Sequence, residues 1–346
     1  MHPGASVNAV TESGTNRYSG NVFEFVRDKR FNAKSPLAPI GPDGKRVDDG
    51  LKRNQYGGAI GGPIVHDRIF FFAGYQGTRT RVMPPGQVAH VPTAAMLAGD
   101  FTAFASPACN AGRTVNLVAG FSGNRIDPSR VSPAALNLAK QLPTTTDPCG
   151  ETLFSLPDDR DEGQYVGCID YQLNGNQSIF GRYMATRDKK PSAFAKTGNV
   201  LTTINPHIDN LAQSFTIGDT KVFGTNGVNN VRFAFNRTAV NRDNDPYFDP
   251  HDLGINVNSY VPHQMIVVVT GGFNIAAATA TRGIAENNSF QVNDDLALVH
   301  GKHQFGFGVN VARFTVDQKT WARGGGQWNF SGQASGLGLA DFLSGA

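Results

Sequence analysis

The residues whose types could do chemistry gather in two acidic stretches. The first is 158–162, DDRDE, and paired carboxylates can act as acid and base in glycoside hydrolysis when a cleft holds them apart. The pattern places no two of them across a cleft, so a secreted hydrolase ranks last among the functions considered. The second stretch lacks the closing Glu of a calcium loop, and we interpret it as solvated; its acids are Asp243, Asp245, Asp249 and Asp252.

Other candidate motifs are incomplete. Gly57 to Pro63, GGAIGGP, has the glycines of a phosphate loop but no following Lys-Ser/Thr, and an apolar run follows it. We interpret these glycines as easing close contact within a strand. His300 and His303 flank a turn and do not form a zinc pair. With no Gly-x-Ser-x-Gly elbow either, we predict no enzyme, no catalytic residue, no metal site and no cofactor.

The chain has three cysteines, too few for a disulfide scaffold. Cys109 and Cys149 lie in an irregular stretch and could pair outside the cytoplasm, so the sequence leaves both outcomes open. Cys168 lies within an alternating segment, which indicates a small packing residue.

The clearest element is Gly301–Phe314, which has the period-two alternation of a strand with one apolar and one polar face. Similar alternation predicts three further hairpins and a first strand at Arg17–Arg27. The predicted hairpin strands are Asn54–Ile64 with Ile69–Arg79, Gln164–Leu173 with Ser178–Arg187, and Asn210–Val222 with Val228–Ala239. Ser289–Val299 is predicted to form a hairpin with Gly301–Phe314.

The connections between these strands are unequal. Each hairpin closes within a few residues, whereas 80–163, 188–209 and 240–288 are long. This asymmetry, with strands of about 10 residues, favours an outer-membrane β-barrel over a soluble sandwich. Within 80–163, Pro133–Gln141 is predicted to be a helix with Ser132 as its N-cap.

Bulk properties exclude some classes. Lys+Arg 31 against Asp+Glu 28 in 346 residues offers no concentrated basic footprint, so we predict no nucleic-acid partner. No run of 18 apolar residues exists that could form a transmembrane helix. The first residues, MHPGASVNAVTESG, lack the basic and apolar regions of a signal peptide, which leaves a cytoplasmic protein or a fragment as alternatives.

Seven segments, taken in order along the chain, resemble one known family, the Oar-like TonB-dependent outer-membrane receptors. They are VNAVTESGTNRYSGNVFEFVRDKRFNA, NQYGGAIGGPIVHDRIFFFAGYQGTR, VPTAAMLAGDF, GNRIDPSRVSPAALNLAKQLP, SIFGRYMATRD, GKHQFGFGVNVAR and ADFLSG. Full chains of that family carry a carboxypeptidase-regulatory-like domain ahead of a plug and a barrel of 22 strands.

The resemblance implies an all-β, antiparallel, up-and-down transmembrane barrel that is incomplete, with about nine strands in an open curved sheet. It implies that residues 1–15 are the last strand of the plug domain. Residues 16–346 would be the N-terminal part of the barrel, with a large extracellular insertion at 80–163 and extracellular chain after about Val316. Both edges of the sheet are expected to be unpaired.

The same resemblance implies import of a substrate that binds at extracellular loops, in the outer membrane of a Gram-negative-type cell. The implied partners are outer-membrane lipid, lipopolysaccharide, an unknown transported substrate, and the TonB complex through an N-terminal part that this sequence lacks. By placement in the long loops, the candidate substrate contacts are Arg79, Arg81, Arg125, Arg130 and Tyr247.

Alternation also predicts the face of individual side chains. The predicted lipid-facing residues are Phe305, Phe307, Val309, Val311, Phe233, Phe235, Ile179 and Tyr183. The predicted lumen-facing residues are Gln304, Asn310, Arg232, Arg182 and Asp170. Tyrosines near strand ends are candidate girdle positions: Tyr56, Tyr75, Tyr165 and Tyr183.

A second hypothesis is a soluble secreted β-sandwich, either an adhesin or a carbohydrate-binding module. In a sandwich the apolar face would pack on a second sheet. In a barrel it would form one bare outward band, so the direction of these side chains decides between the two.

Overall fold

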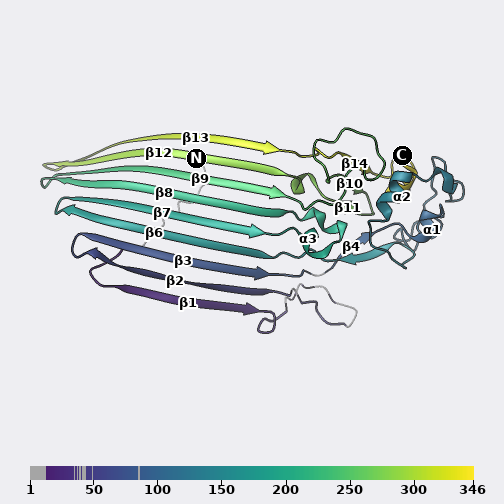
Figure 1. The fold of residues 1–346 in the computed structure, drawn as a ribbon, viewed down its shortest axis with the longest axis horizontal. Helices are drawn as coiled ribbons and strands as arrows, with labels where there is room; N and C mark the ends of the chain where they lie inside the picture. The colour runs from purple at the N-terminus through teal and green to yellow at the C-terminus, as the bar shows by residue number, and fades with distance from the viewer. Residues whose placement is uncertain are drawn as a thin grey trace.

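The computed structural model describes residues 13–346, apart from 35, 37, 39, 41–43, 49 and 85. Nine antiparallel strands form one sheet in the order β1-β2-β3-β6-β7-β8-β9-β12-β13 (Figure 1). This confirms the predicted up-and-down all-β fold of about nine strands. The strands are β1 Ser19–Asp28, β2 Lys52–Val65, β3 Ile69–Arg81, β6 Arg160–Asn174, β7 Gln177–Lys190, β8 His207–Phe223, β9 Gly227–Asp243, β12 Gly283–His300 and β13 His303–Thr320.

The two ends of the sheet differ. One end, the hairpin end, carries short turns at 66–68, 175–176, 224–226 and 301–302. Gly224 and Gly301 have φ of 57° and 60° there, the left-handed region that favours glycine. The connections 82–159, 191–206 and 244–282 all lie at the other end, the loop end (Figure 1).

The strands run further than the alternation predicted. Arg81 pairs with Lys52 and Thr80 with Arg160, so the insertion after β3 is 82–159 and not 80–163. Likewise β13 pairs with β12 up to Thr320, beyond the predicted strand end at Phe314. Polar residues at the strand ends mask the period-two signal, although their backbone groups still join the ladder.

Register places each side chain on one of two faces, because directly opposed residues share a face. Phe305 opposes Leu298, Val311 opposes Val292, and Val292 in turn opposes Phe233. Followed strand by strand, all eight predicted lipid-facing residues lie on one side, here called the apolar face. All five predicted lumen-facing residues lie on the other, here called the polar face.

The apolar band crosses the ladder obliquely. A row is a set of directly paired residues followed from strand to strand. The row that contains Tyr75 on β3 and Tyr165 on β6 contains the polar residues Arg237 on β9 and Thr315 on β13. Conversely, the row of Phe307 reaches Lys221 by β8. The band therefore moves toward the hairpin end from β3 to β13, as expected when strands tilt relative to a level apolar zone.

The apolar face remains bare in the described residues. Phe305, Phe307, Val309 and Val311 are between 46% and 63% exposed, and the small sheets pair with no part of the nine-stranded one. The described residues thus show no second layer of the kind a β-sandwich needs. Strands β1 and β13 each have one neighbour, so both edges are open there, as predicted.

The hydrophobic core lies outside the large sheet. The largest fully buried side chains, including Phe101, Met96 and Leu201, belong to the connections and the chain after β13. We call 82–159, 191–206, 244–282 and 321–346 the loop domain. Its elements are β4 Gln87–His90, α1 Ala94–Leu97, η1 Pro128–Arg130, α2 Pro133–Ala139, β5 Glu151–Phe154, α3 Ala193–Thr197, η2 Val200–Ile204, β10 Ile266–Val269, β11 Asn274–Ile275, η3 Ala278–Ala280, β14 Gln327–Phe330 and α4 Gly338–Ser344.

Hydrogen bonds join the four segments into one unit. β10 pairs in parallel with β14, and the N–H of Val118 donates to the carbonyl of Ser335. The side-chain amide of Asn244 donates to the carbonyls of Thr203 and Ala280. As predicted, Ser132 caps α2 and Pro133 begins it. No helix among the described residues is long and apolar enough to cross a membrane.

Two details concern residues that the sequence singled out. A Cβ on Gly62 would overlap the ring of Tyr18, which fits the interpretation of GGAIGGP as a close-contact segment. Cys168 is 3% exposed within β6. The predicted plug strand at 1–15 lies mostly outside the described residues, and 13–15 are not in a strand.

Cys109 and Cys149 form a disulfide that closes a 40-residue separation within the loop domain. Changing both to Ser is expected to destabilise the loop domain by up to about 4 kcal/mol, because the unfolded segment regains loop entropy. Urea unfolding followed by tryptophan emission measures this, since Trp328 packs on the loop core. A Cys168→Ser variant in the sheet is the control, and an unchanged urea midpoint for the double variant would contradict the expectation.

Candidate functional site in the loop domain and its charged rim

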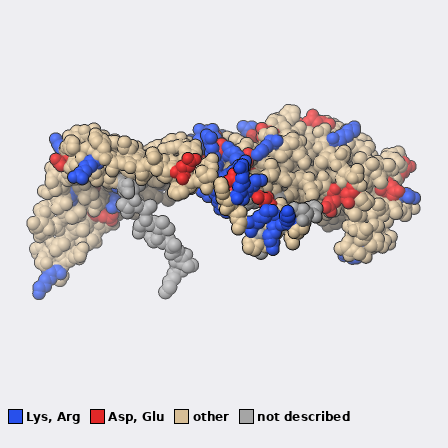
Figure 2. Space-filling model, turned by 90° about the horizontal axis from the view of Figure 1, so that it is seen from below, with Lys and Arg blue, Asp and Glu red and all other residues tan. Residues whose placement is uncertain are grey.

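Lys and Arg side chains gather where the sheet meets the loop domain (Figure 2). Arg81 at the end of β3 contacts Asp161 at 2.7 Å and Asp159 at 3.8 Å. Asp159 also accepts from Lys196 of α3 at 2.6 Å, and Lys190 of β7 contacts Asp158 at 2.7 Å. The acidic stretch 158–162 therefore connects strand ends to the loop domain, and its three aspartates contact cations rather than lying across a cleft from one another.

Further ion pairs continue along the rim. Arg187 contacts Asp209 through two nitrogens, at 3.0 and 2.8 Å. Arg237 contacts Glu286 at 2.7 Å. These pairs are partly exposed and screened, so each contributes at most about 1 kcal/mol, and their larger effect is to fix side-chain direction at the strand ends.

The five candidate substrate contacts do not form one site. Arg79 and Arg81 lie at the end of β3, whereas Arg125 and Arg130 lie in the loop domain. Arg125 contacts Asp100 at 3.0 Å, and Arg130 donates to the carbonyl of Gly120 at 3.4 Å. The five were grouped only by their place in long loops, which says nothing about distance in space.

Tyr247 is a packing residue in this structure. Its hydroxyl donates to the carbonyl of Met265 at 2.6 Å and accepts from the N–H of the same residue at 3.0 Å. Its ring packs edge-on against Phe194 and Phe248, and burial raises the pKa of its hydroxyl. With both functions of the hydroxyl occupied inside the loop domain, the geometry does not favour Tyr247 as a substrate contact.

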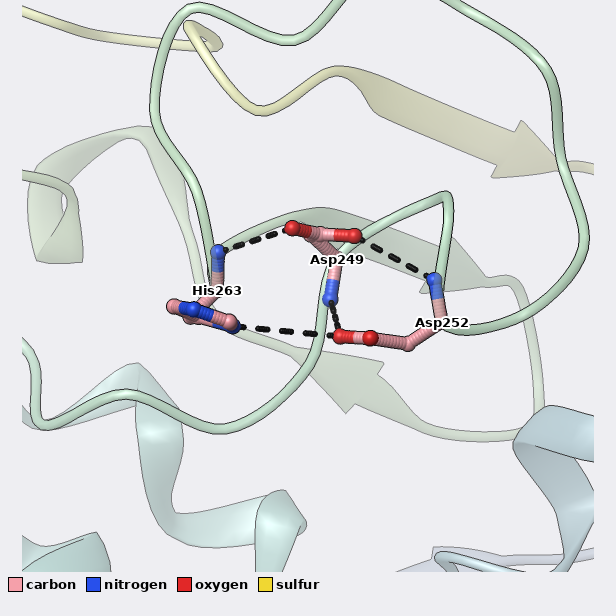
Figure 3. Close-up of side chains that lie close together, drawn as sticks. All are labelled: Asp249, Asp252 and His263. Carbon is pink, nitrogen blue, oxygen red and sulfur yellow. Dashed lines mark hydrogen bonds and ion pairs between the residues drawn. The ribbon is translucent and has the colours of Figure 1, made fainter.

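Asp249, Asp252 and His263 lie side by side (Figure 3). A carboxylate oxygen of each aspartate and a ring nitrogen of His263 all lie within 4.8 Å of one another. Asp249 is buried, and its carboxylate accepts the N–H groups of His251, Asp252 and His263. Burial alone would raise its pKa, but these three donations lower it below the usual range. The interpretation of this stretch as simply solvated is wrong for Asp249, whose oxygens hold the loop 249–263 closed.

Asp341 organises the last loop, and the sequence offered only the ADFLSG motif as a signal for it. It is 2% exposed in α4. Its carboxylate accepts the N–H groups of Gly332 at 2.8 Å and Ser335 at 2.7 Å, and also the hydroxyl of Ser335 at 2.5 Å. From the sequence alone, an aspartate within an apolar motif such as ADFLSG does not show which backbone N–H groups it binds. That becomes clear only when the fold of the turn 332–335 is known.

Two hollows could hold part of a ligand. One, of about 430 Å³, lies beside α2 and is mainly apolar, with Leu97, Leu136 and Leu142 in its walls. Lys140 donates to Asn137 at 3.0 Å beside it. The other, of about 320 Å³, is lined by Phe23, Phe72, Val166 and Met184 among others.

The fold defines the class. An up-and-down sheet that leaves one side bare and apolar, with short turns at one end and a loop domain at the other, is the architecture of an outer-membrane β-barrel protein. Residues 10–346 match the family described as "Outer membrane beta barrel domain". The chain belongs to this family, and its location is the outer membrane.

Three solved structures are similar to the chain. The ferric-catecholate import receptor Fiu from K12 E. coli, in its closed form, has 10% identity and a TM-score of 0.41, with 88% of this chain and 38% of Fiu covered. The CymD monoaromatic hydrocarbon channel and the Pseudomonas putida toluene transporter TodX each have 11% identity, with 87% of this chain and 76% of theirs covered; the TM-scores are 0.23 and 0.20. A search of curated proteins finds no match.

Acid is expected to weaken the loop domain through Asp100. Its pKa lies near 2, lowered by hydrogen bonds from the hydroxyl and N–H of Thr102 and then by Arg125. A carboxyl with a depressed folded pKa stabilises fully above its unfolded pKa of about 3.9, and this contribution is lost as pH falls toward 2.

Asp100→Asn should therefore lower the stability of the loop domain at pH 7 by about 1 kcal/mol or less, since the pair with Arg125 is screened. The difference from the unchanged protein should vanish near pH 2. Urea midpoints at pH 7, 4 and 2 measure this, and a difference that stays constant with pH would argue against it.

Proposed function

We propose that the chain is part of a TonB-dependent, Oar-like receptor that binds a solute at its loop domain and imports it through the barrel. The observation that carries the proposal is a packed loop domain, with its own core and disulfide, built on one end of a bare amphipathic sheet. Long loops of outer-membrane barrels lie outside the cell, where a solute is first met.

The distribution of burial supports a receptor rather than a plain pore. Loops that only line an opening need no core, whereas this loop domain buries side chains from four separate segments of the chain. A rigid support of this kind can hold ligand-contacting side chains in place, and binding residues are commonly carried on such loops. Arg125, Arg130 and the hollow beside α2 remain candidate contacts within it.

The polar face supports passage through the barrel. Arg182, Arg232 and Asp170 lie on it, as would suit a water-filled lumen. Residues 13–16 pass close to this side of β2 and β3, since Gly14 lies against Gly61. Asn16 and Asp67 exchange hydrogen bonds at the hairpin end. The chain thus enters β1 from the polar side, which fits a segment that comes from inside a barrel.

Import can be tested in cells that carry the full-length protein. Depletion of solutes from a defined medium is compared by mass spectrometry between cells with the protein, cells whose residues 92–148 are replaced by a short Gly-Ser linker, and cells without TonB. We expect one solute class to be depleted only in the first. Equal depletion without TonB, at equal amounts of protein in the outer membrane, would refute TonB-dependent import.

The direction of the sheet can be tested on β9. Phe233→Arg puts a charge on the apolar face, and it should weaken folding into lipid by about 2–4 kcal/mol if that face meets the bilayer near its centre. Ala234→Arg, the next residue, puts the same charge on the polar face and should have little effect. Folded and unfolded fractions in lipid vesicles, separated by heat-dependent gel mobility, measure the difference. Equal losses in both variants would contradict the assignment of faces.

A further inference from the structure

A line of arginines borders the apolar band at the loop end. On the strands that run toward this end, the apolar row finishes in Arg79 on β3, Arg187 on β7, Arg237 on β9 and Arg313 on β13. In the ladder these positions step toward the hairpin end, parallel to the oblique apolar band. The cations therefore keep one level relative to the apolar zone, although they occupy different rows of the sheet.

In the part of the chain that the structure describes, exposed cations without a salt bridge gather at this border on β2, β3 and β7. No salt bridge among the described residues includes Lys52, Arg79 or Lys189, all exposed, which we call the outer-rim cations. The acids beside them have other partners. Asp161 contacts Arg81, and Asp209 contacts Arg187, with Lys189 acting on Asp209 only at longer range. Asp28, which opposes Lys52, contacts Arg30 at 3.6 Å.

Register brings the outer-rim cations within reach of one anion. Arg79 and Lys189 both oppose Asp161, one from each side, so their strands are about 10 Å apart. Lys52 opposes Arg81, which lies two residues beyond Arg79 toward the loops. Side chains of this length can converge on a single phosphate group, and Arg in particular offers a two-pronged contact to phosphate oxygens.

Tyrosines place this cluster at the boundary of a bilayer. Just inside it on the same face, the rings of Tyr75 and Tyr165 lie 4.9 Å apart, and Tyr56 lies 6.4 Å from Tyr75. Such aromatic side chains sit at the level of lipid headgroups. At the hairpin end the apolar face is bordered instead by amides and a carboxylate, such as Gln177, Asp219 and Asn229. Lys221 also lies there, over the ring of Phe223, so the loop side is set apart by its line of arginines and not by an absence of cations from the hairpin side.

From this geometry we infer that the outer-rim cations bind the phosphate of a phosphorylated glycolipid in the outer leaflet. The inference rests on the proposed function, because it needs the apolar face toward lipid and the loop domain outside the cell. It assigns Arg79 to the lipid rather than to the transported substrate. It also gives the ion pairs Arg81–Asp161 and Arg187–Asp209 a role, since they keep neighbouring acids from neutralising the cluster.

The test uses the full-length protein in detergent and bis-phosphorylated lipid A, with bound lipid counted by native mass spectrometry. Replacing Lys52, Arg79 and Lys189 together by Gln should weaken lipid A binding by roughly tenfold or more. The matched control is Arg27→Gln with Arg53→Gln, two cations at the same end of β1 and β2 but on the polar face. It should change binding by less than about twofold.

Four results would overturn the inference: equal effects of the two sets of variants, equal binding of dephosphorylated lipid A, equal binding of phosphatidylglycerol, or displacement of lipid A by millimolar inorganic phosphate. Heat-dependent gel mobility confirms that each variant is folded. Cleavage of the loop domain by protease on intact cells reports its exposure separately. If the unchanged protein bound no lipid A but kept an exposed loop domain and normal solute depletion, this inference alone would be rejected.

Discussion

The antiparallel ladder is the constraint on which the rest of the molecule depends. Within lipid, no water is present to satisfy backbone N–H and C=O groups, so each strand must pair along its whole membrane-spanning length. That pairing fixes the register, and register fixes which side chains share a face. A slip of β9 by one residue would turn Phe233 to the polar side and Arg232 to the apolar side, so the amphipathic pattern and the ladder enforce one another.

The two halves of the molecule are stabilised by different means. In the nine strands the buried apolar side chains among the described residues are only Pro63, Cys168 and Ala185, so the sheet relies on its ladder and on a lipid solvent for its apolar face. The loop domain meets water and must bury a core of its own, which it assembles from segments far apart in the sequence. The disulfide and the buried carboxylates of Asp249 and Asp341 then fix its turns, whose backbone groups no regular ladder satisfies.

How far the sequence could predict each half follows from the range of the interactions involved. Alternation is local, so strand order, hairpin turns and the face of residues such as Phe305 and Arg182 could be predicted from the residues alone. Strand ends could not, because Arg160 joins the ladder through its backbone whatever its side chain. The loop core was missed since it depends on contacts such as Asn244 with Thr203, 41 residues apart, and for the same reason Tyr247 was taken for a substrate contact.

The oblique course of the apolar band links the geometry of the ladder to its charges. Strands that are tilted in a bilayer cross its boundary at a different ladder row on each strand, so any feature tied to the boundary must drift across the rows. The tyrosines and the terminal arginines drift together with the apolar residues, which a random scatter of surface charge would not do. Salt bridges within the rim run diagonally between neighbouring strands, since Arg237 opposes Asn288 but contacts Glu286. Arg187 and Arg237 on this line have acidic partners within the protein, whereas no salt bridge among the described residues engages Arg79 or Arg313. The membrane level therefore sets where these cations lie, and the neighbouring acids decide which of them stay available.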